Sequence, residues 1–445
     1  MRLTKIVLIG AASASFGPRM IADAVLTPEL RGSTLVLVDI DEPRLQVMTA
    51  YARRLNEAIG ASLKVESTPD RTRALPGAEF VITSIAIKRD ELWKLDHQIP
   101  LKHGIKQVLG ENGGPGGLSH SLRNIPIVLS IARDMEKLCP DALLMNFTNP
   151  ESRICLAVSR YTNIKFVGLC HGIGMAYDSI ARITGLPMED LEAIAAGLNH
   201  FVWVLDIRRK SSKEDVYPVL RAADRTYDPG YYPLSRKLMR EFGLYPHPSD
   251  DHIGEYIGWA HEYCGTEGYD FERADYWRNR NWEYVERVAK GEEPVPLPQD
   301  FEGSAEQQME ETRQRLSKSG EFAFPIIVST IGNRHDLIEA VNIRNDGLIS
   351  NLPDWAVVEV PAVAGADGIR GVRVGALPRG IAAMLDTQAH VQDLVVEAAV
   401  HGSRELALQA LLADPVVHSA QAAERTLDEL LSVHAPYLPQ FKNLT

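Results

Sequence analysis

Two residues that bind metals well follow two apolar runs in the middle of the chain. Cys170 follows the run from Phe166 to Leu169, and His200 follows the segment from Leu191 to Leu198. A thiolate and an imidazole both ligate divalent metals, and a catalytic site needs fewer protein ligands than a structural zinc site. The pattern is compatible with a catalytic metal at Cys170 and His200. On spacing alone, a buried cysteine and a hydrogen-bonded core histidine are the more common arrangement.

A glycine-rich loop carries a single acid. The stretch from Gly110 to Gly117 has five glycines and one proline around Glu111. A backbone with so few side chains can lie directly against a ligand. Partial burial would raise the pKa of the Glu111 carboxyl, which would then serve as a general acid or base. A mobile surface loop would have the same composition.

Two neutral amides follow another apolar run. Asn146 and Asn149 belong to the motif Asn-Phe-Thr-Asn-Pro, at what we expect to be the carboxyl end of a strand. Open α/β sheets bind their ligands at this end. An amide there can hold a substrate hydroxyl or a ribose without adding charge. Asparagine before proline is also a common turn former, so the motif alone is a weak signal.

The N-terminus predicts a dinucleotide site. A turn of small residues, Gly10 to Gly17, lies between an apolar run and a helical pattern, so that backbone N–H groups can approach a pyrophosphate. Ala12 replaces the second glycine of the usual fingerprint. Asp39 ends the next apolar run, where a carboxylate binds ribose hydroxyls and repels a 2′-phosphate. We therefore expect NAD rather than NADP; a tight packing turn with a surface acid is the alternative. The expected cofactor-binding residues are Gly10, Ala12, Ser13, Ser15, Phe16, Asp39, Arg44 and Asn146.

The elements that position these residues follow from the apolar pattern. Over about the first 170 residues, short apolar runs alternate with longer amphipathic stretches, which is typical of a parallel sheet buried on both faces by crossover helices. We predict an α/β fold, with a Rossmann-like, doubly wound parallel sheet over residues 1–175 and a C-terminal α+β domain for substrate, metal and subunit contacts over residues 176–445. The expected N-terminal strands are Ile6 to Ile9, Leu35 to Asp39, Phe80 to Ile85, Ala142 to Phe147 and Lys165 to Leu169.

The second half has a different pattern. An aromatic-rich stretch from Tyr227 to Arg287 suits a surface that faces a sugar or another subunit, although packing in a second core explains it equally well. The segment from Glu359 to Gly375 is rich in valine and glycine and predicts strands or a hairpin. From Arg379 to Leu431, leucine and alanine recur at helical spacing.

Composition excludes several classes of protein. The chain has 445 residues, enough for two lobes, because single cores stop growing at roughly 250–300 residues. A net charge of −12 without a block of Lys and Arg argues against nucleic-acid and membrane-surface binding. Four cysteines without close pairing favour a reducing compartment. With no secretory signal and no apolar run near the roughly 20 residues of a membrane span, we expect a cytoplasmic protein.

Together these motifs resemble glycoside hydrolase family 4, in the family's order and over essentially the whole chain. The matching motifs are the N-terminal turn, the glycine-rich loop followed by Leu122 to Pro126, Asn-x-Thr-Asn-Pro, Cys-His-Gly, Gly-Leu-Asn-His, and Asn351 to Pro353 leading to Val358 to Pro361. Members resemble lactate and malate dehydrogenases in fold and hydrolyse glycosides with NAD and a divalent metal, commonly manganese. The resemblance implies these cofactors here, and a homodimer or homotetramer.

The resemblance also implies a mechanism. The sugar is oxidised at carbon 3, a base removes the proton of carbon 2, the aglycone leaves carbon 1, water adds, and the hydride returns. Cys170 and His200 would bring the metal to the oxygens of carbons 2 and 3. Glu111 falls where α-specific members have an aspartate that protonates the leaving group.

Other family roles fall on nearby positions. Asn149 matches an asparagine that contacts substrate hydroxyls, and Asn199 is a further substrate candidate. The base matches a segment that contains Asp251 and Tyr256, and either residue can fill the role. A tyrosine would need its pKa lowered by the metal or by an arginine, whereas an aspartate would not.

The residue after Cys170 carries information on the substrate. Cys170-His171-Gly resembles the α-uronidase members, which act on galacturonides or glucuronides. A uronide needs a cation for its carboxylate, and Arg334 is the expected one. Neutral α-glucosides or α-galactosides are the alternative substrates. Two other classes also remain open: a 2-hydroxyacid dehydrogenase, which would release NADH, and a non-enzymatic NAD sensor.

Overall fold

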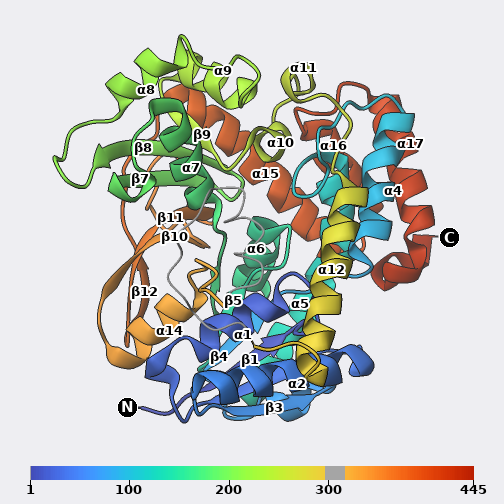
Figure 1. Cartoon of the computed structure of the whole chain (residues 1–445). Coiled ribbons are helices and arrows are strands. Elements are labelled where there is room, and N and C mark those ends of the chain that lie inside the picture. The colour runs from blue at the N-terminus through green and yellow to red at the C-terminus, as the bar shows by residue number, and fades with distance from the viewer. Residues whose placement is uncertain (1, 296–315, 445) are drawn as a thin grey trace.

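The structure, a computed structural model, describes residues 2–295 and 316–444 and is built around one twelve-stranded sheet (Figure 1). The strands are β1 (Lys5–Ile9), β2 (Thr34–Val38), β3 (Lys64–Thr68), β4 (Phe80–Thr83), β5 (Leu143–Asn146), β6 (Lys165–Gly168), β7 (Leu191–Leu198), β8 (Phe201–Arg209), β9 (Tyr245–His247), β10 (Asp336–Arg344), β11 (Val357–Gly365) and β12 (Gly368–Gly371).

The sheet changes character halfway across. Its order is β3-β2-β1-β4-β5-β6-β10-β11-β7-β8-β9, with β12 paired to β11. The strands from β3 to β6 are parallel, and those from β10 onward are antiparallel. Single residue pairs join the parts, Asn342 with Gly168 and Glu359 with Gly197. The predicted fold class is therefore confirmed, with the two halves sharing one sheet.

All five N-terminal strands expected from the apolar runs are present, and the segment from Glu359 to Gly375 contains β11 and β12 as expected. Strand β3 was not anticipated, because it is an edge strand with a polar, largely exposed sequence. The expected boundary between residues 175 and 176 falls inside helix α7, and the division into two domains stays a prediction.

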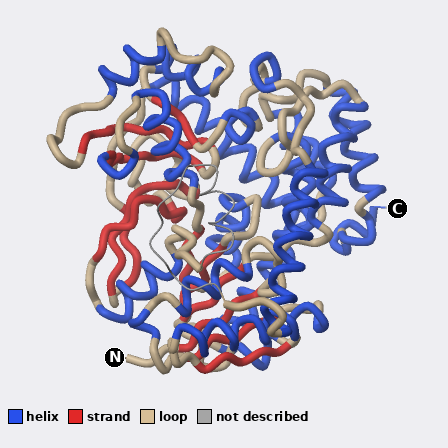
Figure 2. The backbone as a smooth tube through the Cα atoms, in the orientation of Figure 1, coloured by secondary structure: helices blue, strands red, loops and turns tan. Residues whose placement is uncertain are grey.

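Helices cover both faces of the parallel half (Figure 2). Those of the first half are α1 (Gly17–Val25), α2 (Glu42–Ile59), α3 (Arg71–Ala74), α4 (Arg89–Lys102), α5 (Gly114–Leu138), α6 (Glu151–Tyr161) and α7 (Gly172–Thr184). Those of the second half are α8 (Tyr217–Asp224), α9 (Pro233–Phe242), α10 (Asp250–Gly254), α11 (His261–Cys264), α12 (Phe271–Lys290), α14 (Ala323–Gly332), α15 (Arg379–His401), α16 (Arg404–Ala413) and α17 (Ala420–Val433). Among the described helices, none combines the length and apolar character needed to cross a membrane.

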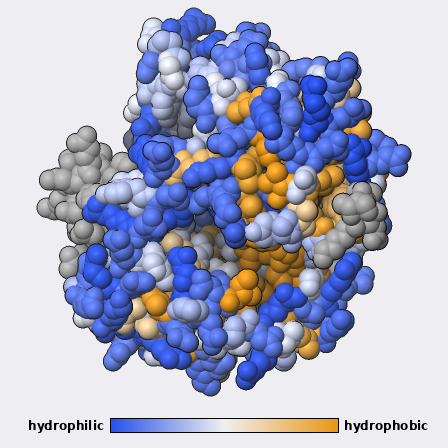
Figure 3. All heavy atoms as spheres, turned by 90° about the vertical axis from the view of Figure 1, so that its right-hand side faces the viewer, coloured by the Kyte–Doolittle hydropathy of each residue, from blue (hydrophilic) through white to orange (hydrophobic). Residues whose placement is uncertain are grey.

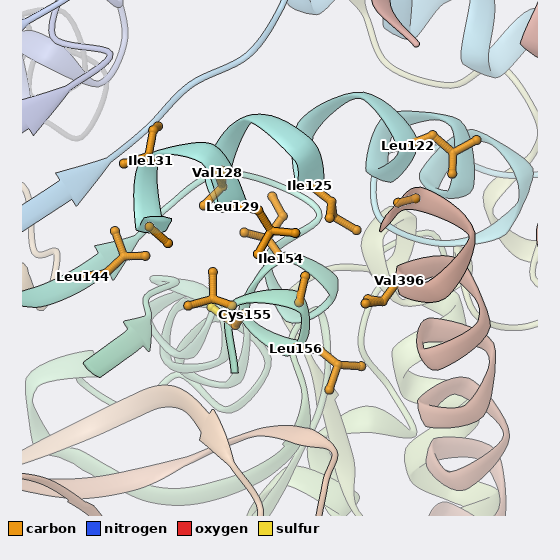
Figure 4. Close-up of a cluster of buried hydrophobic side chains, with 14 of the residues drawn as sticks. Leu122, Ile125, Val128, Leu129, Ile131, Leu144, Ile154, Cys155, Leu156 and Val396 are labelled. Carbon is orange, nitrogen blue, oxygen red and sulfur yellow. The ribbon is translucent and has the colours of Figure 1, made fainter. Parts of the chain in front are cut away.

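Alternate residues of each central strand enter different cores. Ile6 and Leu8 of β1 pack with α1, α2, α12 and α14, whereas Val7 and Ile9 pack with α5, α6 and α15 to α17. This alternation follows from the two-residue period of a strand. In the core that contains Val7 and Ile9, side chains of α5 meet those of α6 and α15 (Figure 4). Each fully buried side chain of this kind contributes about 1.5–3 kcal/mol.

The second half is thus not a separate layer. Helix α12 lies along α2, and α17 lies along α4, so C-terminal helices pack directly on the N-terminal half (Figure 1). The carboxyl ends of β1, β4, β5 and β6 open toward the loops that precede α1, α5 and α7. Gly10, Asn149 and Cys170 follow β1, β5 and β6 closely and therefore lie at this edge.

Candidate active site

The turn after β1 has the geometry of a dinucleotide cradle. Gly10 has φ +90°, and a Cβ there would lie 2.0 Å from the carbonyl oxygen of Ser84; at Gly17 a Cβ would lie 2.1 Å from that of Ala11. Only glycine fits at these two positions. The turn is fixed to β2 because the N–H of Ala12 donates to Asp39 Oδ2 at 2.9 Å. A bare backbone at the start of a helix suits a pyrophosphate.

The other expected cofactor residues lie around this turn. Ser13 Oγ accepts from the N–H of Phe16, and Ser15 is exposed. The guanidinium of Arg44 lies 3.9 Å from the centre of the Trp282 ring on α12, so the second half covers this side of the turn. Asn146 is fully buried and bonds Thr83 and Thr148, which places its amide in the support of the strand end. Their contacts with a cofactor stay predictions.

The glycine-rich loop is anchored by a buried acid that sequence reasoning did not single out. The Oε1 atom of Glu255 accepts from the backbone N–H groups of Glu111, Asn112 and Gly113, the last two at 2.7 and 3.3 Å. A Cβ at Gly113 would lie 2.4 Å from the carbonyl oxygen of Glu255, so the loop packs directly on this residue. The loop is therefore a defined structure, and the alternative of a mobile surface loop is not what the structure shows.

Glu111 differs from the expected acid in its protonation. Its carboxylate is 3% exposed and accepts from Arg89 at 2.9 Å. Burial on its own would raise the pKa of Glu111, but Arg89, with His252 and His200, lowers it to about 2. The expectation of a raised pKa was wrong because the contact with Arg89, which lies on α4, forms only through the packing of α4 against the loop.

Three possible metal ligands converge beside this loop. The ligand atoms of Glu111, His200 and His252 all lie within 4.8 Å of one another, and the two imidazole centres are 4.3 Å apart. Burial and the neighbouring His252 lower the pKa of His200, so its imidazole is neutral and an unprotonated ring nitrogen can bind a metal. Burial would lower the pKa of His252, but Glu255, Asp251 and Glu111 raise it to about 9. A bound metal would have to displace the proton of His252. With that proton lost, two imidazoles and a carboxylate are donors of the types that bind divalent metals.

Cys170 lies at the end of β6, outside that three-residue group. Its thiol is near Asn199, whose amide donates to Glu359 at 3.0 Å, and burial raises the pKa of the thiol well above its usual value. A bound metal would have to displace this proton, as metals do at cysteine. Asn149 is half-buried at the end of the neighbouring β5, and its carbonyl accepts from Asn124 at 2.7 Å.

The two residues expected to select the substrate lie apart. His171 Nδ1 is 2.9 Å from the carboxylate of Glu321, and His171 lines a cavity of about 430 Å³. Arg334 donates to Glu29 at 2.8 Å and lines a second cavity of about 340 Å³. The structure therefore does not bring Arg334 and His171 together in one cavity.

The two candidates for the base have very different surroundings. Tyr256 is 4% exposed, stacks on Phe201 and donates to the carbonyl of Asn199 at 3.3 Å. Burial, together with Glu255, raises the pKa of its hydroxyl well above its usual value. Asp251 is exposed and directly precedes His252 in the chain. Its Oδ1 atom accepts a hydrogen bond from the backbone N–H of His252 at 3.0 Å.

Three residues of this site were missed. His252 and Glu255 belong to the segment that suggested a base, and a histidine directly after Asp251 and three residues before a glutamate is a signal for a metal ligand with a supporting carboxylate. Arg89 had no such signal, because a single arginine at the start of a helix is common. Arg89 matters only because it donates to Glu111, which lies 22 residues further along the chain.

Comparisons with known proteins identify the family of this chain. The model of "Family 4 glycosyl hydrolase" matches residues 5–186, and that of its C-terminal domain matches residues 195–417. The alpha-glucosidase of Erwinia rhapontici is 35% identical, covering 99% of this chain and 100% of its own. The alpha-galactosidase of Bacillus subtilis (strain 168) is 32% identical, covering 99% and 100%, and the alpha-galacturonidase of Thermoanaerobacter italicus is 28% identical, covering 98% and 97%.

Solved structures share the fold. The 6-phospho-beta glucosidase of Thermotoga maritima, solved with manganese, NAD+ and glucose-6-phosphate, has a TM-score of 0.79 at 22% identity and covers 98% of this chain and 99% of its own. Malate dehydrogenase of Plasmodium falciparum has a TM-score of 0.51 at 12% identity and covers 91% of this chain and 100% of its own. The two family models together span most of the sequence. The chain is therefore a glycoside hydrolase that belongs to family 4 of the glycosyl hydrolases.

Proposed function

We propose that this enzyme hydrolyses α-glycosides with NAD and a divalent metal, manganese by preference, through oxidation at carbon 3, elimination, water addition and re-reduction. The observation that carries the proposal is the convergence of Glu111, His200 and His252 at the carboxyl edge of the sheet that also holds the nucleotide turn. A simple 2-hydroxyacid dehydrogenase needs no such set of ligands.

The cofactors would supply two kinds of chemistry, a hydride acceptor at carbon 3 and a Lewis acid at the oxygens of carbons 2 and 3. His200 and Cys170 would hold the metal, and the backbone between Gly10 and Gly17 would hold the dinucleotide. Asn149 would orient a sugar hydroxyl at the end of β5. The buried loop around Glu111 excludes water from one side of the site.

Among the two candidate bases, the surroundings favour Asp251. Its carboxylate is exposed, whereas the hydroxyl of Tyr256 is buried, and burial raises the pKa of that hydroxyl well above its usual value. Tyr256 would then position the turn at Asn199 through its hydrogen bond. Glu111, held ionised by Arg89, would ligate the metal or accept a proton rather than donate one.

The surroundings of His171 favour a neutral hexoside over the uronide that the sequence suggested. A uronide carboxylate needs an unpaired cation to bind it. His171 is already paired with Glu321, and Arg334 is already paired with Glu29. Among the described residues that line the cavity beside His171 there are two acids, Asp178 and Glu339, and neither lysine nor arginine. The order of identity, 35% to an alpha-glucosidase and 28% to an alpha-galacturonidase, points the same way.

A substrate panel tests the proposal. We expect cleavage of 4-nitrophenyl α-glucoside or α-galactoside that requires NAD, manganese and a thiol, each omitted in turn, and slower cleavage of the α-galacturonide and α-glucuronide. NADH should not accumulate, because the hydride returns in each turnover. Accumulation of NADH with a hydroxyacid, and no glycoside cleavage, would refute the proposal. Faster cleavage of the uronides would restore the uronide assignment.

The base assignment has its own test. We expect Asp251→Asn to lower kcat by about 10²–10⁴-fold, the usual contribution of a general base, and Tyr256→Phe to change it by less than about 3-fold. Exchange of the carbon 2 proton with deuterated water should be lost only in the aspartate variant. The opposite result would make Tyr256 the base.

We also propose a homodimer or homotetramer in the cytoplasm. Figure 3 shows hydrophobic residues gathered in a central hollow of one face, ringed by hydrophilic ones. Helices α16 and α17 lie on this side of the molecule, and they carry the exposed apolar side chains Leu412 and Val433. Large apolar areas on a surface often mark contacts between subunits. Sedimentation equilibrium would measure the oligomer.

A further inference from the structure

We propose that His252 ligates the divalent metal together with His200 and Glu111, and that Glu255 holds this set of ligands in place. The inference rests on the proposed metal dependence and extends it. The sequence indicated a pair of ligands, Cys170 and His200. The structure adds an imidazole and a carboxylate from two other parts of the chain.

The first argument is proximity. The ligand atoms of Glu111, His200 and His252 lie within 4.8 Å of one another. Bonds of about 2.0–2.2 Å to one ion leave neighbouring ligand atoms roughly 3–4 Å apart, so small side-chain rotations suffice. Glu111 and His200 are buried, and His252 is half-buried, which leaves one side open toward the substrate. Catalytic metal sites keep such an open side.

The second argument is that three separate elements are shaped to converge. Glu111 comes from the loop before α5, His200 from the two-residue turn between β7 and β8, and His252 from α10. His200 has φ +62°, a left-handed conformation that glycine and asparagine adopt more readily. Residues held in such conformations concentrate at functional sites, where the surrounding structure determines them.

The third argument is the position of Glu255. One of its oxygens collects the amides of the Glu111 loop, and the other lies 3.9 Å from His252 Nδ1. Glu255 is 1% exposed, so a single buried carboxylate anchors the loop and faces the imidazole. At 3.9 Å the two atoms are beyond hydrogen-bond distance, and neither has another hydrogen-bond partner among the described residues. Closing this gap would give His252 the carboxylate hydrogen bond that orients metal-ligating histidines. The amide of Asn112 links the remaining members, at 3.0 Å from His200 Nδ1 and 3.3 Å from Glu111 Oε2.

The fourth argument is the chemistry of the donors. Two imidazoles and one carboxylate form a nitrogen and oxygen set, which suits manganese better than a soft thiolate does. Arg89 and Asn112 each donate to a different oxygen of Glu111, and ligating carboxylates commonly have such hydrogen bonds. Cys170, whose thiol stands beside Asn199 and Glu359, is the ligand proposed above with His200, and Glu111 and His252 would add to that pair.

The experiment measures manganese binding directly, without substrate or turnover. Free Mn²⁺ would be titrated by electron paramagnetic resonance into wild type, His252→Gln and His390→Gln, each loaded with NAD. His390 is an exposed histidine on α15 and provides the matched control. We expect affinity to fall at least about 10-fold in His252→Gln and to stay unchanged in His390→Gln. Glu255→Gln should fall by about 10–100-fold, the range for residues that orient ligands.

Each other outcome is decisive. Unchanged manganese affinity in His252→Gln, with loss in His200→Gln, would overturn the role of His252 and leave the proposed function intact. Absence of manganese binding in the NAD-loaded wild type would overturn the proposed function itself. Retained NAD binding and an unchanged melting temperature would show that the variants fold. If His252→Gln unfolds, His252→Asn and the absorption bands of bound Co²⁺, compared with those of Cys170→Ser, answer the same question.

Discussion

Two ion pairs link helix α4 to its neighbours. In the pair with the loop before α5, α4 contributes the cation, and in the pair with α5 itself, α4 contributes the anion. At one, Arg89 of α4 donates to Glu111 at 2.9 Å; at the other, Asp96 of α4 accepts from Arg123 of α5. The side chains of Asp96 and Arg123 are 0% and 2% exposed, whereas Arg89 is 39% exposed and Glu111 3%. We call Arg89–Glu111 the open pair, because Arg89 is exposed and Glu111 lies beside His200 and His252. We call Asp96–Arg123 the closed pair, because both side chains are buried.

The difference shows that an unusual pKa does not by itself mark a functional residue. Burial would raise the pKa of both acids, but Arg123 and His434 lower that of Asp96 to about 2, and Arg89 with two histidines lowers that of Glu111 equally. Asp96 is surrounded by partners that neutralise it, and His434 lies 2.9 Å away. Glu111 instead faces His200 and His252. Its neighbours, rather than its pKa, make it a candidate for catalysis.

The largest expected effect is on activity at the open pair. Glu111→Gln should lower kcat by about 10²–10⁴-fold, because it removes a charged group at the reacting atoms. The free energy of unfolding should fall less than in Asp96→Asn, because Arg89, left without its partner, is 39% exposed to solvent, whereas Arg123 is 2% exposed. Steady-state kinetics and urea unfolding measure the two quantities. An active variant would show that Glu111 is as structural as Asp96.

The closed pair should respond in the opposite way. Asp96→Asn should lower the free energy of unfolding by about 3–5 kcal/mol, because Arg123 is left as an uncompensated buried charge. Folded enzyme should keep its kcat within about 3-fold, since Asp96 does not face His200 or His252. Urea unfolding and active-site titration of the surviving folded protein separate these effects. A large loss of kcat in folded Asp96→Asn would show that the two pairs act as one network.

The contrast also explains how much the sequence could predict. The strands of the parallel half followed from continuous apolar runs, and Gly10 and Asp39 followed from the turn between them, because these are patterns of neighbouring residues. Glu111 and His200 were found because each stands next to such a pattern. Strand β3 was missed because a polar edge strand carries no apolar period.

Contacts between distant residues had no comparable signal. Arg89 meets Glu111, Glu255 meets three loop amides, and Arg334 meets Glu29 across 305 residues. Each contact depends on how α4, α10 and α14 pack, which is a tertiary result. Sequence patterns therefore could not predict that Glu111 is ionised. Nor could they predict that Arg334 pairs with Glu29, away from His171.

A smaller effect is expected in acid. Asp96 has a folded-state pKa of about 2 against an unfolded value of about 3.8, so its ionised form stabilises the fold above pH 4. This contribution, about 2 kcal/mol, should be lost as pH falls from about 4 to 2. The difference in unfolding free energy between wild type and Asp96→Asn should therefore shrink over that range. A difference that stays constant would mean that Asp96 is not ionised in the folded protein.

The smallest effect is expected at Arg89, which belongs to the site but is open to water. Arg89→Gln should lower kcat/KM by about 10-fold, or 1.4 kcal/mol, because Glu111 loses an orienting donor while its loop stays fixed by Glu255. Lys94→Gln is the matched control, since Lys94 lies on the same helix, 3.9 Å from Asp275 and 5.2 Å from the centre of the Phe271 ring. Lys94→Gln should hardly change stability. Arg89→Gln leaves the buried carboxylate of Glu111 without its cation and should lower the free energy of unfolding. Equal kinetics in the two variants would mean that Glu111 needs no partner on α4. The contrast between an open, functional pair and a closed, structural one would then reduce to the histidines alone.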